Sequence, residues 1–253
     1  MIRMENVFSG YNGKVVLKNI NFEVKAGFVG IIGPNGAGKT TFLKTIASLV
    51  DIYKGRLYIN EKSIKCYKRK ELSKLLTVVS QDLFPIYDYT VRELVEMGRI
   101  AHQGFLPNWT AEDELQVEKA INTIGIKHLE RRRYSQISSG EKRLVMLARA
   151  LAQNVKVILV DELELHLDPK HKMTIASYLK KMCKMGMVIL AVFHDIDLAL
   201  SYSDRIIGIK DGKILFDLST KSNDLKENLE KLYGIEFVEV NNHHGKKIFP
   251  LYK

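Results

Sequence analysis

Residues 33–40 have the types and spacing of a phosphate-binding loop. They match the pattern G-x-x-x-x-G-K-[ST] at every fixed position and read Gly33-Pro34-Asn35-Gly36-Ala37-Gly38-Lys39-Thr40. Glycines let a backbone fold tightly around an anion with its N–H groups pointing inward. Lys39 can then reach the terminal phosphates, the Thr40 hydroxyl can bind Mg²⁺, and Thr41 adjoins both. The loop therefore predicts that the chain binds a nucleoside triphosphate.

The residues on either side of this loop favour a strand before it and a helix after it. Phe28-Val29-Gly30-Ile31-Ile32 is a short apolar run, typical of a buried strand. The apolar residues of 41–47 fall at helical spacing, so the loop opens a helix whose N-terminus favours an anion. This context makes a simple glycine-rich turn the weaker interpretation.

A second chemical feature is an apolar strand that ends in two carboxylates. Val157-Ile158-Leu159-Val160 precedes Asp161 and Glu162. A buried strand delivers its last residues to the carboxyl edge of a sheet, where the phosphate loop also lies. Asp161 is then placed to hold Mg²⁺, and Glu162 to take a proton from an attacking water or to orient it. A helix cap is the alternative, and the upstream phosphate loop disfavours it.

Length and composition limit the architecture. The 253 residues are 46% hydrophobic, which suffices for one large domain or two intimate subdomains. Two distant cysteines, Cys66 and Cys183, suggest neither a disulfide framework nor a metal cluster and favour a reducing cytosol. The longest apolar run, Met187 to Phe193, is far short of a membrane span, so we expect a soluble protein that can still dock on a membrane partner.

The formal charge of +10 arises from 39 basic and 29 acidic residues. Basic residues crowd three stretches, namely 62–74, 131–133 and 170–184. Such a balance suits nucleic acid, acidic lipid or an acidic partner, but Lys-rich helices in solvent are the simpler interpretation. No basic run is interleaved with aromatic residues as a stacking platform would be. Charge alone does not decide between these partners, and a nucleic-acid partner is not the expected one.

The periodicity of the chain predicts alternating strands and helices. Two strands flank the turn Tyr11-Asn12-Gly13, and further strands are expected at 56–60, 76–80, 155–160, 187–193, 205–209, 213–216 and 237–240. Helices are expected at 91–99, capped by Thr90 and Glu93, from Thr110 to Gly125, at 170–185 and at 225–232. The fold class is α/β, with a largely parallel sheet in a P-loop NTPase core, an N-terminal antiparallel β subdomain and an inserted α-helical subdomain at about 85–153.

The order of these motifs makes a family resemblance specific. The turn Ile137-Ser138-Ser139-Gly140-Glu141 opens an amphipathic helix between the phosphate loop and the acidic strand. Gln81 follows a strand, a loop ends in His166-Leu167-Asp168, and Phe193-His194-Asp195 follows another strand. The chain resembles the ATP-binding subunit of an ABC (ATP-binding cassette) transporter over residues 1–218, which leaves 219–253 as a C-terminal extension. His243-His244 in that extension is expected to be a surface loop.

The resemblance implies a role for several residues. Tyr11 resembles the aromatic side chain that stacks on adenine, Gln81 the glutamine that touches Mg²⁺ and the attacking water, and His194 the histidine that contacts the γ-phosphate. Asp168 resembles the aspartate that communicates across a dimer. Ser138 and the N–H groups around Gly140 complete the ATP site of the opposite subunit. The resemblance therefore implies a head-to-tail homodimer or heterodimer that holds two ATP molecules and hydrolyses them.

Two stretches depart from the family pattern. The usual signature is Leu-Ser-Gly-Gly-Gln, whereas here Ser139 replaces a glycine and Glu141 replaces the glutamine. We expect weakened rather than abolished binding. Leu163-Glu164-Leu165 stands where Pro-Thr-Ser is common, which affects the coupling between the two ATP sites. Glu162 is retained, so hydrolysis is still expected.

The stretches 89–99 and 194–199 are similar to those in importers of iron chelates, haem and cobalamin. This similarity implies permease subunits docked near Gln81 and the 90–99 helix, a substrate-binding protein, and a peripheral location on the cytoplasmic face of the membrane. Two alternatives stay open. One is a soluble ABC ATPase that acts on nucleic acid or the ribosome. The sequence shows neither the long coiled-coil insertion nor the second cassette that would support this alternative. The other is a nucleotide-gated scaffold without turnover, which the altered signature would suit.

Overall fold

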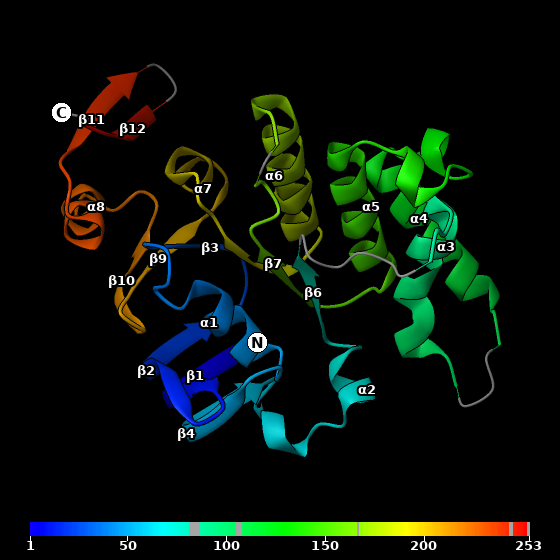
Figure 1. Cartoon of the computed structure of the whole chain (residues 1–253), viewed down its shortest axis with the longest axis horizontal. Coiled ribbons are helices and arrows are strands. Elements are labelled where there is room, and N and C mark those ends of the chain that lie inside the picture. Colours follow the sequence, from blue (N-terminus) through cyan, green and yellow to red (C-terminus); the bar gives the residue numbers. More distant parts are fainter. Residues whose placement is uncertain (81–86, 105–107, 166, 243–244, 252–253) are drawn as a thin grey trace. The chain divides into compact units, whose positions relative to one another are not determined.

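The computed structural model describes residues 1–80, 87–104, 108–165, 167–242 and 245–251 (Figure 1). The chain divides into two compact units. The first comprises Met1–Cys66 and Val188–Lys253, and the second comprises Tyr67–Met187. The segment 219–253 therefore belongs to the first unit, and the second unit contains strands as well as the helical segment.

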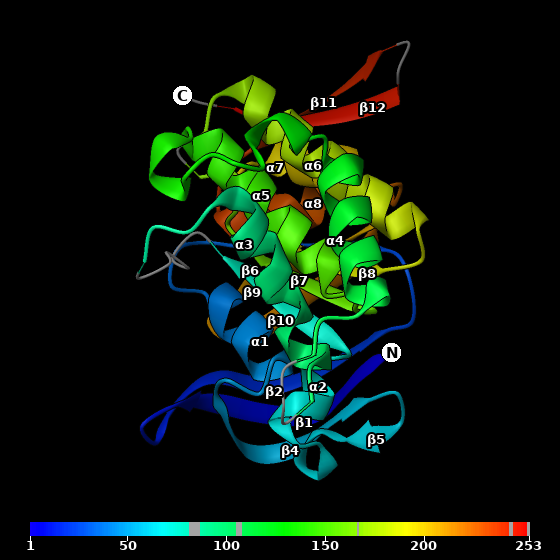
Figure 2. The ribbon, with the colours of Figure 1, turned by 90° about the vertical axis from the view of Figure 1, so that its right-hand side faces the viewer.

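An antiparallel sheet forms the N-terminal part of the first unit (Figure 2). Its strand order is β2-β1-β4-β5, with β1 at Ile2–Tyr11, β2 at Lys14–Val24, β4 at Asp51–Ile59 and β5 at Lys62–Ser63. The β1–β2 connection turns at Asn12 and Gly13, whose φ angles of 48° and 78° suit a two-residue hairpin turn. The expected antiparallel subdomain is confirmed.

Parallel strands form the rest of the first unit. Strand β3 (Phe28–Ile32) pairs in parallel with β8 (Val188–Val192) on one side and with β9 (Arg205–Lys210) on the other, and β10 (Lys213–Ser219) runs antiparallel to β9. Every residue of β3 and β8 is buried, as their continuous apolar runs predict. Helix α1 (Lys39–Ile46) packs on β1, β2, β4 and β8, and Phe42 meets the ring of Phe22 edge to face.

The C-terminal residues add a helix and a hairpin to this unit. Helix α8 (Leu225–Tyr233) packs on β9 and β10, and β11 (Phe237–Asn242) pairs antiparallel with β12 (Gly245–Pro250). Helix α7 (Ile196–Tyr202) contacts β3 and β12. The helix expected at 225–232 and the strand at 237–240 are confirmed, whereas β12 was not predicted. His243 and His244 lie outside the described residues.

The second unit combines two parallel strands with helices. Strand β6 (Leu76–Ser80) pairs with β7 (Val157–Asp161), so that Ser80 lies opposite Asp161. The helices are α2 (Arg69–Leu72), α3 (Val91–Glu96), α4 (Ala111–Ile124), α5 (Ser139–Ala152) and α6 (Pro169–Lys184). Helices α3, α4 and α5 pack against one another (Figure 2), and α5 also contacts α6. The expected α-helical subdomain lies here.

Capping decides where the two predicted helices of this group begin. The Thr90 and Thr110 hydroxyls accept hydrogen bonds from the N–H groups of Glu93 and Asp113, three residues on, as predicted. Helix α4 ends at Gly125 as expected, but the helix expected to reach Arg99 is α-helical only to Glu96. Residues 97–102 are a 3₁₀ helix. The Gly98 backbone approaches the Arg149 carbonyl so closely that a side chain would not fit.

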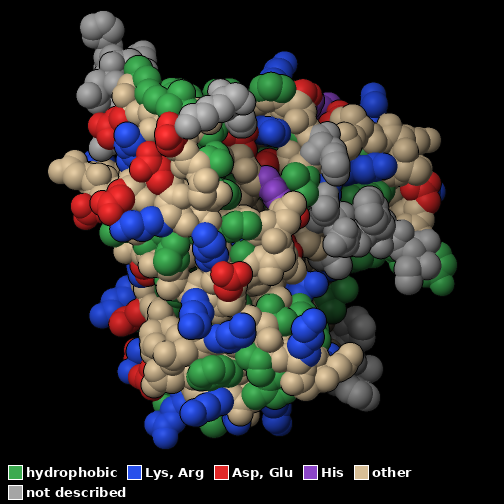
Figure 3. All heavy atoms as spheres, turned by 60° about the vertical axis from the view of Figure 1, so that its left-hand side comes forward, with side chains coloured by type: hydrophobic (Ala, Val, Ile, Leu, Met, Phe, Trp, Pro, Cys, Tyr) green, Lys and Arg blue, Asp and Glu red, His purple; other side chains and the backbone are tan. Residues whose placement is uncertain are grey.

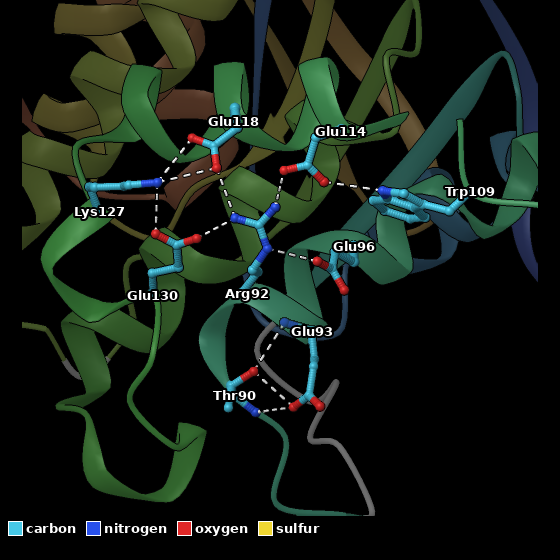
Figure 4. Close-up of polar contacts among 9 residues, drawn as sticks. All are labelled: Thr90, Arg92, Glu93, Glu96, Trp109, Glu114, Glu118, Lys127 and Glu130. Carbon is cyan, nitrogen blue, oxygen red and sulfur yellow. Dashed lines mark hydrogen bonds and ion pairs between the residues drawn. The ribbon is translucent and has the colours of Figure 1, made fainter. Parts of the chain in front are cut away.

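Arg92 of α3 lies at the centre of an ion-pair network (Figure 4). Its guanidinium forms ion pairs with the side chains of Glu96, Glu114, Glu118 and Glu130. Hydrogen bonds to Glu118, which has the largest effect, and to Glu130 and Glu114 raise the pKa of Arg92 above its usual value. Lys127 in turn bonds Glu118 and Glu130. The network ties α3 to α4 and to the segment that follows α4.

A buried ion pair supports the same helices. Arg99 donates from Nε to Asp113 at 2.8 Å and from Nη1 to the Ala152 carbonyl at 2.9 Å. Both ionised side chains are only 5% exposed. Burial opposes the ionisation of Asp113, but hydrogen bonds from Thr110 and Arg99 outweigh it and lower the pKa of Asp113 to about 2. The pair joins the 3₁₀ segment to α4 and to the end of α5.

One face of the molecule carries charged side chains of both signs (Figure 3). On the face drawn in Figure 3, Lys and Arg side chains stand among hydrophobic, uncharged and, in the upper part, acidic ones. Among the residues the structure describes, no helix combines the length and hydropathy that a membrane crossing requires.

Replacing Arg99 by leucine would leave the Asp113 carboxylate buried without its guanidinium partner. We expect the free energy of unfolding to fall by about 3–5 kcal/mol. Arg92→Leu is the matched control: its side chain has more partners but is 26% exposed, and water weakens such pairs. Urea denaturation followed by circular dichroism measures both losses. A loss in Arg92→Leu as large as that in Arg99→Leu would contradict this ranking.

The same pair predicts how stability depends on acid. The folded pKa of Asp113, about 2, lies below the value of about 3.9 in an unfolded chain, so ionised Asp113 stabilises the fold above about pH 4. This stabilisation is lost as the pH falls towards 2. We therefore expect the difference in unfolding free energy between wild type and Arg99→Leu to shrink over that range. Urea titrations at several pH values test this, and a constant difference would rule Asp113 out as the group responsible.

Candidate functional site

The phosphate loop connects the carboxyl end of β3 to α1. A side chain at Gly33 would collide with the Ile209 carbonyl oxygen of β9, and Gly38, which caps α1, has a φ of 104° that favours glycine. The Lys39 side chain is buried, and its Nζ donates to the carbonyls of Gly33 at 2.9 Å and Pro34 at 3.1 Å. The ammonium group is thereby held over the loop, where an anion bound by the backbone would meet it.

Helix α1 is anchored immediately behind this loop. Thr40 is half-buried in its first turn, and Thr41 is buried. The Thr45 hydroxyl donates to the Thr41 carbonyl at 2.7 Å and shares a 2.8 Å hydrogen bond with the buried Ser9 hydroxyl of β1. The helix N-terminus that would face a phosphate is therefore fixed to the antiparallel sheet.

His194 is brought to the same sheet edge as the phosphate loop. The Phe193 N–H donates to the Ile31 carbonyl at 3.0 Å. This hydrogen bond continues the pairing of β8 with β3 as far as the residue before His194. His194 itself is exposed, and the Asp195 side chain caps α7. Tyr11 ends β1 in the same unit, and its side chain is 41% exposed. Both side chains are therefore accessible to a ligand.

The acidic pair lies at the carboxyl end of β7 in the second unit. Asp161 is the last residue of the strand, and Glu162 has a left-handed φ of 51° that residues with a Cβ adopt rarely. Such backbone strain clusters at functional sites. Gln81 comes directly after β6 in sequence but lies outside the described residues.

The chemistry of these side chains fits a magnesium ion. Thr40 and Asp161 offer hydroxyl and carboxylate oxygens, which are the ligand types that Mg²⁺ prefers, and Mg²⁺ usually keeps several waters beside one or two carboxylates and the substrate phosphates. Among the described residues there is no group of three or more His, Cys, Asp and Glu side chains that could hold a metal ion by itself. Each of these oxygens is of a type that suits a magnesium ion also bound by nucleotide phosphates.

The signature turn forms the N-terminus of α5. Ser138 caps the helix, and Glu141 accepts from its N–H and its hydroxyl, both at 2.8 Å. These two hydrogen bonds, helped by Arg132 and His128, lower the pKa of Glu141. Ser138 and Ser139 are exposed, whereas Gly140 is buried. The glutamate that departs from the family pattern therefore completes a capping box.

The residues after Glu162 are packed rather than exposed. Leu163 and Glu164 are only 1% and 3% exposed, and Leu165 is half-buried. Asp168 caps α6 by accepting from the His171 N–H at 3.0 Å, and its other oxygen lies 2.5 Å from the His171 Nδ1. These contacts lower the pKa of Asp168, the backbone hydrogen bond most. His166, expected in the same loop, lies outside the described residues.

The sequence did not single out two residues that contact these motifs. Tyr233, the last residue of α8, accepts a hydrogen bond from the Gly33 N–H, and burial raises the pKa of its phenol to about 12 despite that bond. No local pattern links positions so far apart in the chain. His171 lies against both Asp168 and Gly140. His171 follows Asp168 by three residues, and this spacing is what could have indicated their contact; nothing in the sequence indicates the contact with Gly140.

Comparisons with known proteins agree with this geometry. The family model described as ABC transporter matches residues 17–164. The chain is 32% identical over 243 residues to the ferric enterobactin transport ATP-binding protein FepC of Escherichia coli (strain K12), covering 95% of this chain and 90% of FepC. It is 36% identical over 248 residues to the phosphonates import ATP-binding protein PhnC 2 of Oceanobacillus iheyensis, covering 93% of this chain and 96% of that protein.

A solved structure extends the likeness to three dimensions. The structure of a dimeric post-hydrolysis state of the ATP-binding cassette MJ0796, bound to ADP and Pi, matches with a TM-score of 0.74 and 28% identity. The match covers 88% of this chain and 100% of that one. The resemblance found in the motifs is confirmed, since the chain belongs to the ABC transporter family as an ATP-binding subunit that hydrolyses ATP.

Proposed function

We propose that two copies of this chain, or one copy and a close relative, bind two ATP molecules head to tail and use their hydrolysis to drive an importing permease. The observation that carries this proposal is the phosphate loop on β3 and α1, whose buried Lys39 ammonium lies over backbone that only glycine permits. The dimeric state of the similar cassette MJ0796, with ADP and Pi, supports the arrangement.

Within one subunit, the nucleotide would be held from the phosphate end to the base. The loop N–H groups and Lys39 bind the β- and γ-phosphates, and the Thr40 hydroxyl and the Asp161 carboxylate hold the magnesium ion. Mg²⁺ supplies neutralisation of the developing phosphate charge. The exposed ring of Tyr11 stacks on adenine, a contact that any flat π-face can make.

The partner subunit would supply the other half of each pocket. Its exposed Ser138 hydroxyl and the N–H groups near Gly140, at the N-terminus of α5, bind the γ-phosphate, because four N–H groups of a helix end lack partners within the helix. Asp168 lies at the next helix N-terminus and transmits the state of one site to the other. Loss of the γ-phosphate removes the link between subunits and lets the dimer open.

Hydrolysis itself needs a group that handles the proton of the attacking water. Glu162 takes a proton from the attacking water or orients that water, and its backbone is held at positive φ. Exposed His194 contacts the γ-phosphate, and Gln81 completes the site. Catalysis of phosphoryl transfer is mostly positioning and charge stabilisation, and these residues would supply both.

The cargo and the partners follow from the relatives and from two stretches of sequence. The names of the relatives state transport of ferric enterobactin and import of phosphonates, and the second name supports an importer. Residues 89–99 and 194–199 favour iron chelate, haem or cobalamin as the cargo class. The permease would dock near Gln81 and α3, with a substrate-binding protein delivering cargo to it. The chain would act as a peripheral subunit at the cytoplasmic face of the membrane.

Glu162→Gln tests the catalytic assignment and the dimer together. The amide keeps the size of the side chain but cannot take a proton, so we expect phosphate release to fall about 10²–10⁴-fold. ATP should then accumulate in a stable dimer, measured by small-angle scattering. The double variant Lys39→Ala/Glu162→Gln is the control and should stay monomeric, because it cannot bind the phosphates. Lone protomers of Glu162→Gln in saturating ATP, even with the cognate permease subunits, would refute the proposal.

Glu141→Gln tests the altered signature. The amide can still accept from the Ser138 N–H, but it removes a negative charge near the γ-phosphate of the partner site. We expect opposite effects on ATP-driven dimerisation and on stability. In the Glu162→Gln background, dimerisation should need about fivefold less ATP, because removing one charge about 10 Å from the γ-phosphate in a partly exposed site weakens the repulsion by roughly that factor. Unfolding free energy should fall by about 0.5 kcal/mol, because a carboxylate no longer faces the helix N-terminus. Unchanged ATP dependence would place Glu141 away from the nucleotide.

A further inference from the structure

We propose that His171 is a positioning residue that clamps the signature turn: its ring is held by Asp168 on one edge and covers Gly140 with the other. The inference rests on the proposed function, because the signature turn matters only if it binds the nucleotide of the partner subunit. It assigns to His171 a part in the site that the motifs do not contain.

The geometry of the imidazole ring carries the inference. Its Nδ1 lies 2.5 Å from an Asp168 carboxylate oxygen. The opposite edge, formed by Cδ2 and Nε2, faces Gly140: a Cβ built on that glycine would lie 2.8 Å from Nε2 and nearer still to Cδ2. Real Cβ atoms essentially never approach this closely, so the ring occupies the space that any other residue at 140 would need.

Burial shows what the ring does to the turn. Gly140 is buried, although its neighbours Ser138 and Ser139 are exposed. The His171 side chain is itself 40% exposed, so it covers the turn from the surface rather than from the core. One side of the turn is therefore fixed against His171, and the side that carries the serine hydroxyls stays accessible.

The ring also joins two helix N-termini. Gly140 is the second residue of α5 and His171 the third residue of α6, and the two helices are in contact (Figure 1). Each N-terminus carries a partial positive charge, and each has a carboxylate in its capping hydrogen bonds: Glu141 accepts from the Ser138 cap of α5, and Asp168 caps α6. Through the His171 ring, the N-terminus of α5, which binds the γ-phosphate of the partner site in the proposed function, is held against the N-terminus of α6.

The contact also explains how Asp168 can influence the signature turn. Asp168 accepts from both the N–H and the ring of His171, so a shift of the loop before α6 moves the ring. The ring touches Gly140 directly, so the turn must follow or lose its support. His171 is thus the physical link between two motifs that sequence order separates by residues 142–167.

The decisive experiment is a double-mutant cycle on His171 and Gly140 in the Glu162→Gln background. His171→Ala should raise the ATP concentration at half-maximal dimerisation about tenfold, because the turn loses the ring that covers Gly140, and contacts of this kind are coupled by roughly this factor. Gly140→Ala alone should raise it at least as much. Adding Gly140→Ala to His171→Ala should cost less than about threefold more, because the ring that opposes the new methyl group is gone.

Matched variants separate positioning from simple support of α6. His171→Asn can still hydrogen-bond Asp168 but lacks the ring edge, so it should restore the unfolding midpoint and not the ATP dependence of dimerisation. Met173→Ala, at an exposed position on the same helix, should change neither. Binding of a fluorescent ATP analogue to the monomer should be equal in all variants, because the phosphate loop is intact. Restoration of both readouts by asparagine would show a merely structural histidine and overturn the inference.

A second readout of the cycle separates this inference from the proposed function. Urea unfolding of the parent, the two single variants and the double variant does not require a dimer. The losses of unfolding free energy caused by His171→Ala and Gly140→Ala should again be less than additive in the double variant. Additive costs would show that the ring does not oppose a side chain at 140 and would refute the contact. Dimers that form normally in His171→Ala would refute the positioning role alone. Absence of dimers in the Glu162→Gln parent would refute the proposed function instead.

Discussion

The pairing of β3 between β8 and β9 is the interaction on which the phosphate loop depends. Parallel strands end at one edge, and the hydrogen bond from Phe193 to Ile31 carries the pairing past the end of β8. On the other side the Ile209 carbonyl comes so close to Gly33 that a side chain is excluded. The first glycine of the loop is therefore required by the sheet, before any phosphate is considered. Gly33 is therefore required by its packing against β9 as well as by any role in binding phosphate.

Local physics explains why much of the fold was predictable from sequence. A hydroxyl at the helix cap, an acid three residues later and a glycine at the end are neighbours in the chain, so Thr110, Asp113 and Gly125 marked α4 correctly. The continuous apolar run of β3 and the turn at Asn12-Gly13 are local in the same sense. The phosphate loop could be predicted for the same reason, because its backbone conformation is determined by consecutive residues.

Features that depend on distant residues could not be predicted. The α-helix that begins at Thr90 changes to a 3₁₀ helix because Gly98 meets the Arg149 carbonyl and Arg99 reaches Asp113, neither of which is visible from residues 90–99. The hydrogen bond between Tyr233 and Gly33 joins the last helix to the first motif. Residues 219–253, which looked separable in sequence, therefore supply a direct neighbour of the phosphate loop. Periodicity carries no signal for such contacts.

The same distinction explains which departures from the family signature the turn can accept. Ser139 occupies an exposed position at the start of α5, whereas Gly140 is buried. Glu141 keeps the reciprocal hydrogen bonds of a capping box, which a glutamine at that position could also make. Gly140 is different, because the His171 ring fills the space beside it. The turn thus keeps glycine at the position where the His171 ring leaves no room for a side chain.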